Sequence, residues 1–401
     1  MRLLLAVSEL GDNGRIFRTQ LPSLEIAAAN LGIATTTISL DSAKGFGELL
    51  RRLEDEDELI YTAIWCYDHR VEGFSKLAQR DLFIEARATL VADISDHPFT
   101  PFMLSRLHNA SSSFIYKILE PTDKKAVYEI SRKDLTCVDT NAVLCPLVDT
   151  SLLPEYTNRQ ITIFFPMSTE YKQDNLAPYF EHLPPELAKA VSFAFKEYRY
   201  ELCVTIYEFF RTLLPTNFFI NEIRASISEA AYYSTLIILS AADMRERFRW
   251  RMECLRAVSE QVKDKLIVVA GSRPTSEMHF NDNVHFANGN LTFPQVVNLY
   301  ANSKFVVHCH PTYYHGLHER PVHAQLMGCV LVTDYLPWTS RLKSQSFVGI
   351  SSRTDLGPLH RALSLPDPRM DLDLPLASEI NKTLGSEAFL NNLLSLKRTN
   401  F

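Results

Sequence analysis

Short apolar segments alternate with helix-length amphipathic segments in the N-terminal part of the chain, and this alternation limits the possible folds more than any other feature. Gly32 follows the first helical segment at the position where a left-handed residue commonly ends a helix. Strands and helices in alternation predict a parallel sheet that helices cover on both faces. The predicted strands are residues 3–7, 34–39, 59–65 and 89–94, and the predicted helices are residues 21–30, 46–53 and 78–86.

A long helical stretch separates this region from a second region of alternation. Residues 184–233 are rich in aromatic side chains at helical spacing, which indicates a helix core or, alternatively, a docking surface for a partner. The alternation then resumes up to residue 333. In this second region the predicted strands are residues 161–166, 236–239, 266–270, 305–310 and 330–333, and the predicted helices are residues 245–262 and 293–301.

The two regions of alternation predict two domains. Residues 141–149 fit a last strand followed by a turn, and the polar, proline-containing residues 149–159 mark the boundary. The sequence therefore predicts an α/β protein with two Rossmann-like domains. The expected bounds are 1–150 for the first domain, 159–380 for the second with a helical insertion at 184–233, and 381–401 for a C-terminal helix.

Composition excludes several classes of protein. The net charge of −6 and the pI of about 6.1 argue against a dedicated nucleic-acid binder, which usually carries a basic stripe. Seven scattered cysteines without a C-x-x-C pair predict reduced thiols. No apolar stretch approaches the roughly 20 residues that span a bilayer, and residues 1–8 fit a buried strand better than a signal peptide. We expect a cytoplasmic protein; peripheral membrane contact, partner proteins and oligomeric state stay open.

The segment from residue 308 to 334 carries the most chemical information. A loop with Gly316 follows a predicted strand, at the edge where open α/β sheets bind ligands. Pro321 favours a helix start, and a helix N-terminus attracts anions. Arg320 adds a guanidinium that suits phosphate oxygens. Together these features suit a diphosphate with an attached sugar. Further candidates to contact this ligand are Ser272, Arg273, His310, Tyr313, Tyr314, His315, Glu319 and His323.

Residues 284–334 resemble the donor-binding half of GT-B glycosyltransferases, and are most similar to the spore-maturation CgeB-like branch. That branch has an arginine, an acidic residue three positions on, and a small-residue helix ending in glycine before an apolar strand. Arg320, His323, Gly328 and residues 330–334 follow this layout. The resemblance implies a GT-B fold, with two Rossmann-like domains facing across a cleft, in a bacterial, hexosyltransferase-like enzyme without a cofactor. The implied reaction moves a sugar from a UDP- or GDP-type nucleotide diphosphate-sugar to a glycan, protein or small-molecule acceptor.

The sequence departs from this family at two positions. Retaining members often carry two glutamates eight positions apart, where this chain has His315 and His323. A neutral imidazole cannot bind two ribose hydroxyls as a carboxylate does. Glu319 is the nearest replacement carboxylate. The site is therefore either a divergent donor pocket or one that no longer catalyses, and retention or inversion of the sugar stays open.

The acceptor is expected on the first domain, where loops after the strands supply the contacts. The turn with Gly11, Asn13 and Gly14 resembles the first acceptor-side loop of the family. Asp96 and His97 follow the strand at 89–94, and either side chain could deprotonate an acceptor hydroxyl in an inverting transfer. The alternative for this pair is a structural role, with Asp96 as a helix cap and His97 packed beside a proline.

The alternatives to a metal-free transferase are a metal site and two rival functions. Five of the twelve histidines lie between His308 and His323, but no acidic or cysteine set completes a metal site, so we expect no metal. Another Rossmann-type nucleotide-sugar enzyme is disfavoured because no G-x-G-x-x-G follows the opening strand. A catalytically inactive GT-B-like binding or scaffold protein stays open because histidines replace the two glutamates.

Overall fold

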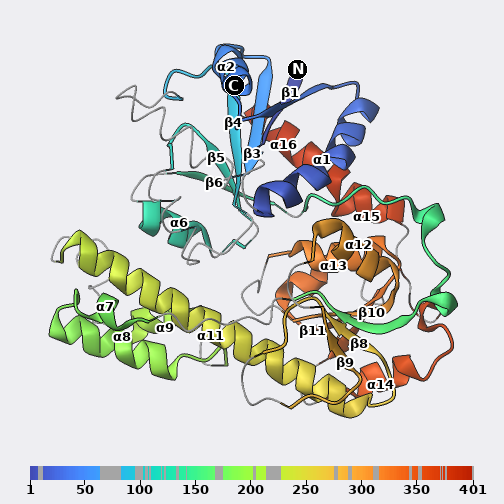
Figure 1. The fold of residues 1–401 in the computed structure, drawn as a ribbon. Coiled ribbons are helices and arrows are strands. Elements are labelled where there is room, and N and C mark those ends of the chain that lie inside the picture. The colour runs from blue at the N-terminus through green and yellow to red at the C-terminus, as the bar shows by residue number, and fades with distance from the viewer. Residues whose placement is uncertain are drawn as a thin grey trace.

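The computed structural model contains two parallel sheets in separate halves of the molecule, with a group of helices extending from the C-terminal half (Figure 1). It describes residues 1–7, 12–63, 83–94, 103, 107, 110–118, 120–121, 123–131, 135–140, 142–167, 175–201, 205–213, 227–274, 279–287, 291–309, 316–342, 346–350, 355–370, 372, 374 and 377–399.

The N-terminal sheet has six parallel strands in the order β2-β1-β3-β4-β5-β6. Leu4 and Leu5 of the first strand are fully buried, as expected of a parallel sheet covered on both faces. Gly32 ends the first helix with φ 68°, which confirms the predicted cap. The strands are β1 (Arg2–Val7), β2 (Ala34–Ser39), β3 (Glu58–Ala63), β4 (Thr89–Ile94), β5 (Ile115–Ile118) and β6 (Thr136–Asp139); the helices are α1 (Asp12–Asn30), α2 (Ala43–Arg52) and α6 (Asp123–Ser131).

Several predictions for this half were wrong. The helix predicted at 78–86 is not present at its described end, where residues 83–86 are not helical. Helix α1 begins at Asp12, so Gly14 lies inside a helix and not in a turn. Pro22 lies within the same helix, and it made the sequence pattern appear to begin later. Residues 142–149 form no strand, and the last strand is β6. The short elements β5 and α6 were missed because neither has a long periodic pattern.

The C-terminal sheet also has six parallel strands, in the order β12-β11-β10-β7-β8-β9. The chain leaves β7 toward β8 on one side and leaves β10 toward β11 on the other. The neighbours β7 and β10 therefore form the topological switch point of the sheet, where α/β proteins bind ligands. The strands are β7 (Ile161–Phe165), β8 (Ile267–Val269), β9 (Val284–Phe286), β10 (Ser303–His308), β11 (Val330–Asp334) and β12 (Phe347–Ile350). The helices are α12 (Phe293–Ala301), α13 (Glu319–Leu326) and α14 (Gly357–Leu363), with short 3-10 turns at η3 (Pro337–Arg341) and η4 (Pro368–Met370).

The helical insertion is longer than predicted. The strand predicted at residues 236–239 is wrong, because these residues lie inside one continuous helix that also contains the predicted helix 245–262. Ile238 and Leu239 face the core of the insertion, while Leu236 packs on the core of the N-terminal sheet. An apolar run buried on several sides does not distinguish a strand from a helix. The helices are α7 (Ala177–Phe180), α8 (Pro185–Glu197), α9 (Ile206–Leu213) and α11 (Glu229–Gln261).

The chain crosses between the two halves and then returns. A linker with two 3-10 turns, η1 (Thr150–Leu152) and η2 (Tyr156–Asn158), leads to the second sheet. The single helix predicted at 381–401 is instead two helices, α15 (Ala377–Thr383) and α16 (Ser386–Thr399). Helix α16 returns to the first half (Figure 1), where Phe389 is fully buried. The Phe389 ring meets Tyr61 edge to face, and Lys117 Nζ lies 3.9 Å from its centroid.

Candidate functional site

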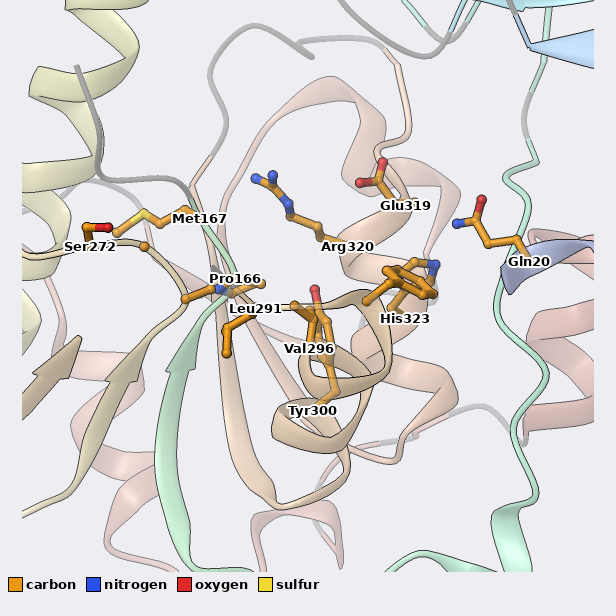
Figure 2. A pocket seen from close by; sticks show the side chains of 13 residues that line it. Gln20, Pro166, Met167, Ser272, Leu291, Val296, Tyr300, Glu319, Arg320 and His323 are labelled. Atoms are coloured by element: carbon orange, nitrogen blue, oxygen red, sulfur yellow. The ribbon is translucent and has the colours of Figure 1, made fainter. Parts of the chain in front are cut away.

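A pocket of about 360 Å³ lies at the switch point of the C-terminal sheet. The loops after β7 and β8, helix α12 and the start of α13 form its walls, and helix α1 of the N-terminal half approaches from the other side (Figure 2). Its size falls in the range of small-molecule sites. The lining residues are Gln20, Pro166, Met167, Ala270, Gly271, Ser272, Leu291, Phe293, Val296, Tyr300, Glu319, Arg320 and His323.

The N-terminus of α13 borders this pocket. Nδ1 of the buried His318 lies 3.2 Å from the backbone nitrogen of Arg320 and 2.8 Å from Oε2 of Glu319. Without a proton Nδ1 caps the helix by accepting from Arg320 N–H, and with a proton it donates to Glu319. Pro321 is the third helical residue, where a missing N–H costs no intrahelical bond. With the Arg320 N–H capped and no N–H on Pro321, the positive end of the helix dipole is what this terminus offers to an anion.

Two buried polar atoms at the pocket wall have no hydrogen-bond partner in the part of the chain that the structure describes. They are Oη of Tyr300 and Nε2 of His323. A ring N–H of His323 is hydrogen-bonded to the backbone of Leu144, and burial lowers the pKa of His323 to about 4. The ring is therefore neutral at pH 7 and Nε2 is a bare acceptor. Burial raises the pKa of Tyr300 well above its usual value, so its hydroxyl keeps the proton and can donate.

Arg320 is the cation that lines the pocket, beside the carboxylate of Glu319. Its side chain extends from α13 toward the side of Met167 and Ser272 (Figure 2). Arg251 of α11 is partly buried, and its pKa falls to about 9 because of burial and then because of the charges on Arg320 and Arg247. The positive charges of Arg251 and Arg320 repel each other, and a bound anion would relieve that repulsion.

Glu319 is the carboxylate of the pocket. Burial works to raise its pKa, but the charges of His318 and Arg320 and the His318 hydrogen bond outweigh that effect, so the pKa lies below its usual range. Burial lowers the pKa of His318, which leaves Arg320 as the standing positive charge at neutral pH. Glu319 is thus ionised, and it can accept hydrogen bonds from ligand hydroxyls.

The N-terminal half reaches this site at two points. Oε2 of Glu120, a residue just after β5 that is only 1% exposed, accepts a 2.8 Å hydrogen bond from the backbone N–H of Gly316. Gln20 of α1 lines the pocket and is also buried. The loop that leads into α13 is therefore held from both halves of the molecule.

The structure brings together Ser272, Glu319, Arg320 and His323 of the predicted site. Gly316 contacts Glu120, while the exposed Arg273 follows Ser272 without lining the pocket. Asn13 and Gly14 belong to the first turn of α1. Gly11, Asp96, His97, His310, Tyr313, Tyr314 and His315 lie outside the described residues.

Sequence reasoning missed Gln20, Met167, Phe293 and Tyr300. Tyr300 lies on a correctly predicted helix, but its apolar neighbours at helical spacing made it look like an ordinary core residue. Its position opposite the start of α13 depends on tertiary packing, and no local sequence signal reveals it.

The described residues hold no group of three or more His, Cys, Asp or Glu side chains arranged to bind a metal ion. His308 is buried at the end of β10, and burial lowers its pKa well below the usual value. Among these residues, no helix is both long enough and apolar enough to cross a bilayer.

No protein-family model matches this sequence. No curated protein matches it either. Among solved structures, an alpha-glucosyltransferase (AGT) in complex with UDP superposes with a TM-score of 0.52 at 9% identity, covering 99% of this chain and 100% of that one. An alpha-glucosyltransferase in complex with UDP and a 13-mer DNA containing a central A:G mismatch gives a TM-score of 0.51 at 10% identity, with the same coverage.

The chain has the GT-B fold. The likeness extends over nearly the whole of both chains, and at this identity it establishes the fold alone. In the GT-B arrangement seen here, two Rossmann-like sheets meet across the region where Gln20 and Glu120 approach α13. The fold predicted from residues 284–334 is thereby confirmed.

Proposed function

We propose that this protein is a glycosyltransferase that binds a nucleotide diphosphate-sugar in the pocket at the start of α13. One observation carries the proposal. A helix N-terminus and Arg320, both suited to phosphate, lie beside a buried donor and acceptor, Tyr300 Oη and His323 Nε2, that have no protein partner in the described chain. Such a set of polar groups within an otherwise apolar pocket is typical of a small-molecule site.

Different groups in the pocket suit different parts of the donor. The diphosphate binds the guanidinium of Arg320 at the positive end of the α13 dipole, and the charge of Arg251 adds to that of Arg320. Hydroxyl groups of the donor satisfy Tyr300 and His323, because a hydroxyl both accepts and donates. Glu319 supplies a carboxylate for further hydroxyl groups of the donor, in place of the two glutamates found in the family that the sequence resembles.

The transfer itself needs a base and an electrostatic stabiliser. The acceptor hydroxyl loses its proton to the base, its oxygen bonds to the anomeric carbon, and the bond from that carbon to the diphosphate breaks. We propose Asp96 or His97 as the base, since in the sequence they come directly after the end of β4 at Ile94. Arg320 and the positive end of the α13 dipole stabilise the negative charge that develops on the leaving diphosphate.

The test uses the full chain and a panel of nucleotides. Thermal shift with UDP, GDP, CMP and their sugars identifies the ligand, because a ligand that binds only the folded state raises the melting temperature. Chromatography then measures release of the nucleoside diphosphate. Slow release from one donor supports the transferase, whereas tight binding without release or transfer indicates a binding protein. No binding to any member of the panel, or oxidation of a nicotinamide cofactor, overturns the proposal.

A further inference from the structure

A second cavity, of about 760 Å³, lies near the C-terminal end of α13. One wall is the linker around η2, and the other is the returning segment around η4; these two segments run along the same side of the C-terminal half (Figure 1). The end of α13 contributes Gln325 and Gly328. The volume falls within the range of small-molecule sites.

Two buried polar atoms at this cavity also have no hydrogen-bond partner among the described residues. They are Oη of Tyr156, a residue 2% exposed, and Oε1 of Gln325, a residue 5% exposed. The amide nitrogen of Gln325 is occupied, since it donates to Ser346 Oγ at 3.1 Å. Buried polar groups in folded proteins are nearly always paired, so an unpaired donor and an unpaired acceptor on residues that line one cavity point to a ligand.

Both arginines of the cavity are engaged by other groups of the protein. Arg159 donates to the carbonyls of Ser303 at 2.8 Å and Met327 at 2.7 Å. Arg369 pairs with Asp367 at 2.6 Å, and its guanidinium lies 4.3 Å from the centroid of the Tyr156 ring. Glu155 balances the remaining charge, so two arginines and two carboxylates line the wall. Because both arginines are engaged, the cavity favours a neutral ligand over a phosphate.

We propose that this cavity is a second binding site for a neutral saccharide. Neighbouring sugar hydroxyls both donate and accept, so one sugar ring can satisfy Tyr156 Oη and Gln325 Oε1 together. Thr150 and Thr157 offer further hydroxyl groups, and Leu153 and Leu374 offer apolar surface for the C–H faces of the ring. The site is separate from the pocket at the start of α13, and the inference does not depend on the function proposed for that pocket.

The test is calorimetric titration of the full chain with glucose, galactose, mannose, N-acetylglucosamine, maltose and sucrose. We expect at least one of them to bind with a Kd of about 1 mM or tighter. Tyr156→Phe removes only the hydroxyl and should weaken that binding roughly 3- to 10-fold, while the melting temperature of the free protein stays the same or rises.

Tyr128→Phe is the control, because it removes one hydroxyl from an exposed tyrosine of α6, which lines neither pocket. It should leave saccharide binding unchanged. No binding by any of the six saccharides overturns the proposal, and so does binding that Tyr156→Phe leaves intact or Tyr128→Phe weakens. Tighter binding of glucose 6-phosphate than of glucose at the Tyr156-dependent site also overturns it, because the cavity would then be an anion site.

Discussion

The rings of Tyr300 and His323 meet edge to face at a centroid distance of 6.1 Å and an interplanar angle of 87°. The two residues come from different helices, α12 and α13, which the fold brings together at the switch point. Each fixes the orientation of the other, and each has one buried polar atom without a hydrogen-bond partner in the described chain. A donor and an acceptor held in place in this way are preorganised for a ligand.

Tyr300→Phe should weaken ligand binding without lowering the stability of the protein. The variant loses a buried hydroxyl that has no partner within the described residues, so we expect the free energy of unfolding to stay the same or rise. Affinity for the nucleotide found in the thermal-shift panel should fall roughly 3- to 10-fold, as for one neutral hydrogen bond. Urea denaturation and calorimetry measure the two quantities. A large loss of stability would show that the hydroxyl is paired in the free protein.

Arg320→Ala should weaken binding of the nucleoside diphosphate without unfolding the protein. A hydrogen bond to a charged group contributes about 1.5–3 kcal/mol, which corresponds to roughly 10- to 100-fold in affinity. Arg256→Ala is a suitable control, since Arg256 lies on α11 with 64% of its side chain exposed. Equal affinities of the two variants in calorimetry would remove Arg320 from the proposed site.

The protein should become less stable as the pH falls into the mildly acidic range, because His323 is buried in its neutral form. The unfolded chain binds a proton at this residue with a pKa near 6.5, whereas the folded state does so only near 4. As the pH falls from 6.5 to 4, the unfolded state therefore gains a proton that the folded state does not, and the free energy of unfolding falls by about 3 kcal/mol.

Urea denaturation between pH 7.5 and 4 tests this expectation, with His323→Gln as the comparison. The variant should lose less stability over that window than the parent protein does. His308 and His318, whose pKa values burial also lowers, are present in both proteins and cancel in the difference. Parallel stability profiles would contradict the assignment of a neutral, buried His323.

Glu120→Ala should loosen the contact between the two halves. It leaves the Gly316 N–H without its acceptor, and it removes a charge that supports Arg341, whose pKa burial lowers. We expect a loss of about 1–3 kcal/mol in the free energy of unfolding. Glu120→Gln keeps an acceptor oxygen and should retain most of that stability. If both variants unfold at the same urea concentration as the parent protein, the contact does not hold the halves together.

The sequence correctly predicted the helices and strands whose ends are set by neighbouring residues in the sequence. The strands at 34–39 and 89–94 and the helix at 293–301 were placed to the residue, because turn and capping residues flank a clear period. The false strand at 236–239 shows the limit of this reasoning, since the packing that buries those residues on several sides is set by distant segments. In the same way, Glu319, Arg320 and His323 were found because one helix carries all three, whereas Tyr300 and Gln20 depend on tertiary packing. Asp96 and His97 stay a prediction.

Helix α16 has a consequence for how the protein is made. The apolar core of the N-terminal sheet contains strand β1, which begins at Arg2, and also four residues of α16: Phe389, Leu390, Leu393 and Leu394. The N-terminal sheet leaves the ribosome before the second domain, yet the helix that covers part of it is synthesised after that domain. The order of synthesis and the order of folding therefore differ, and the nascent first domain carries an uncovered apolar surface until α16 has been synthesised.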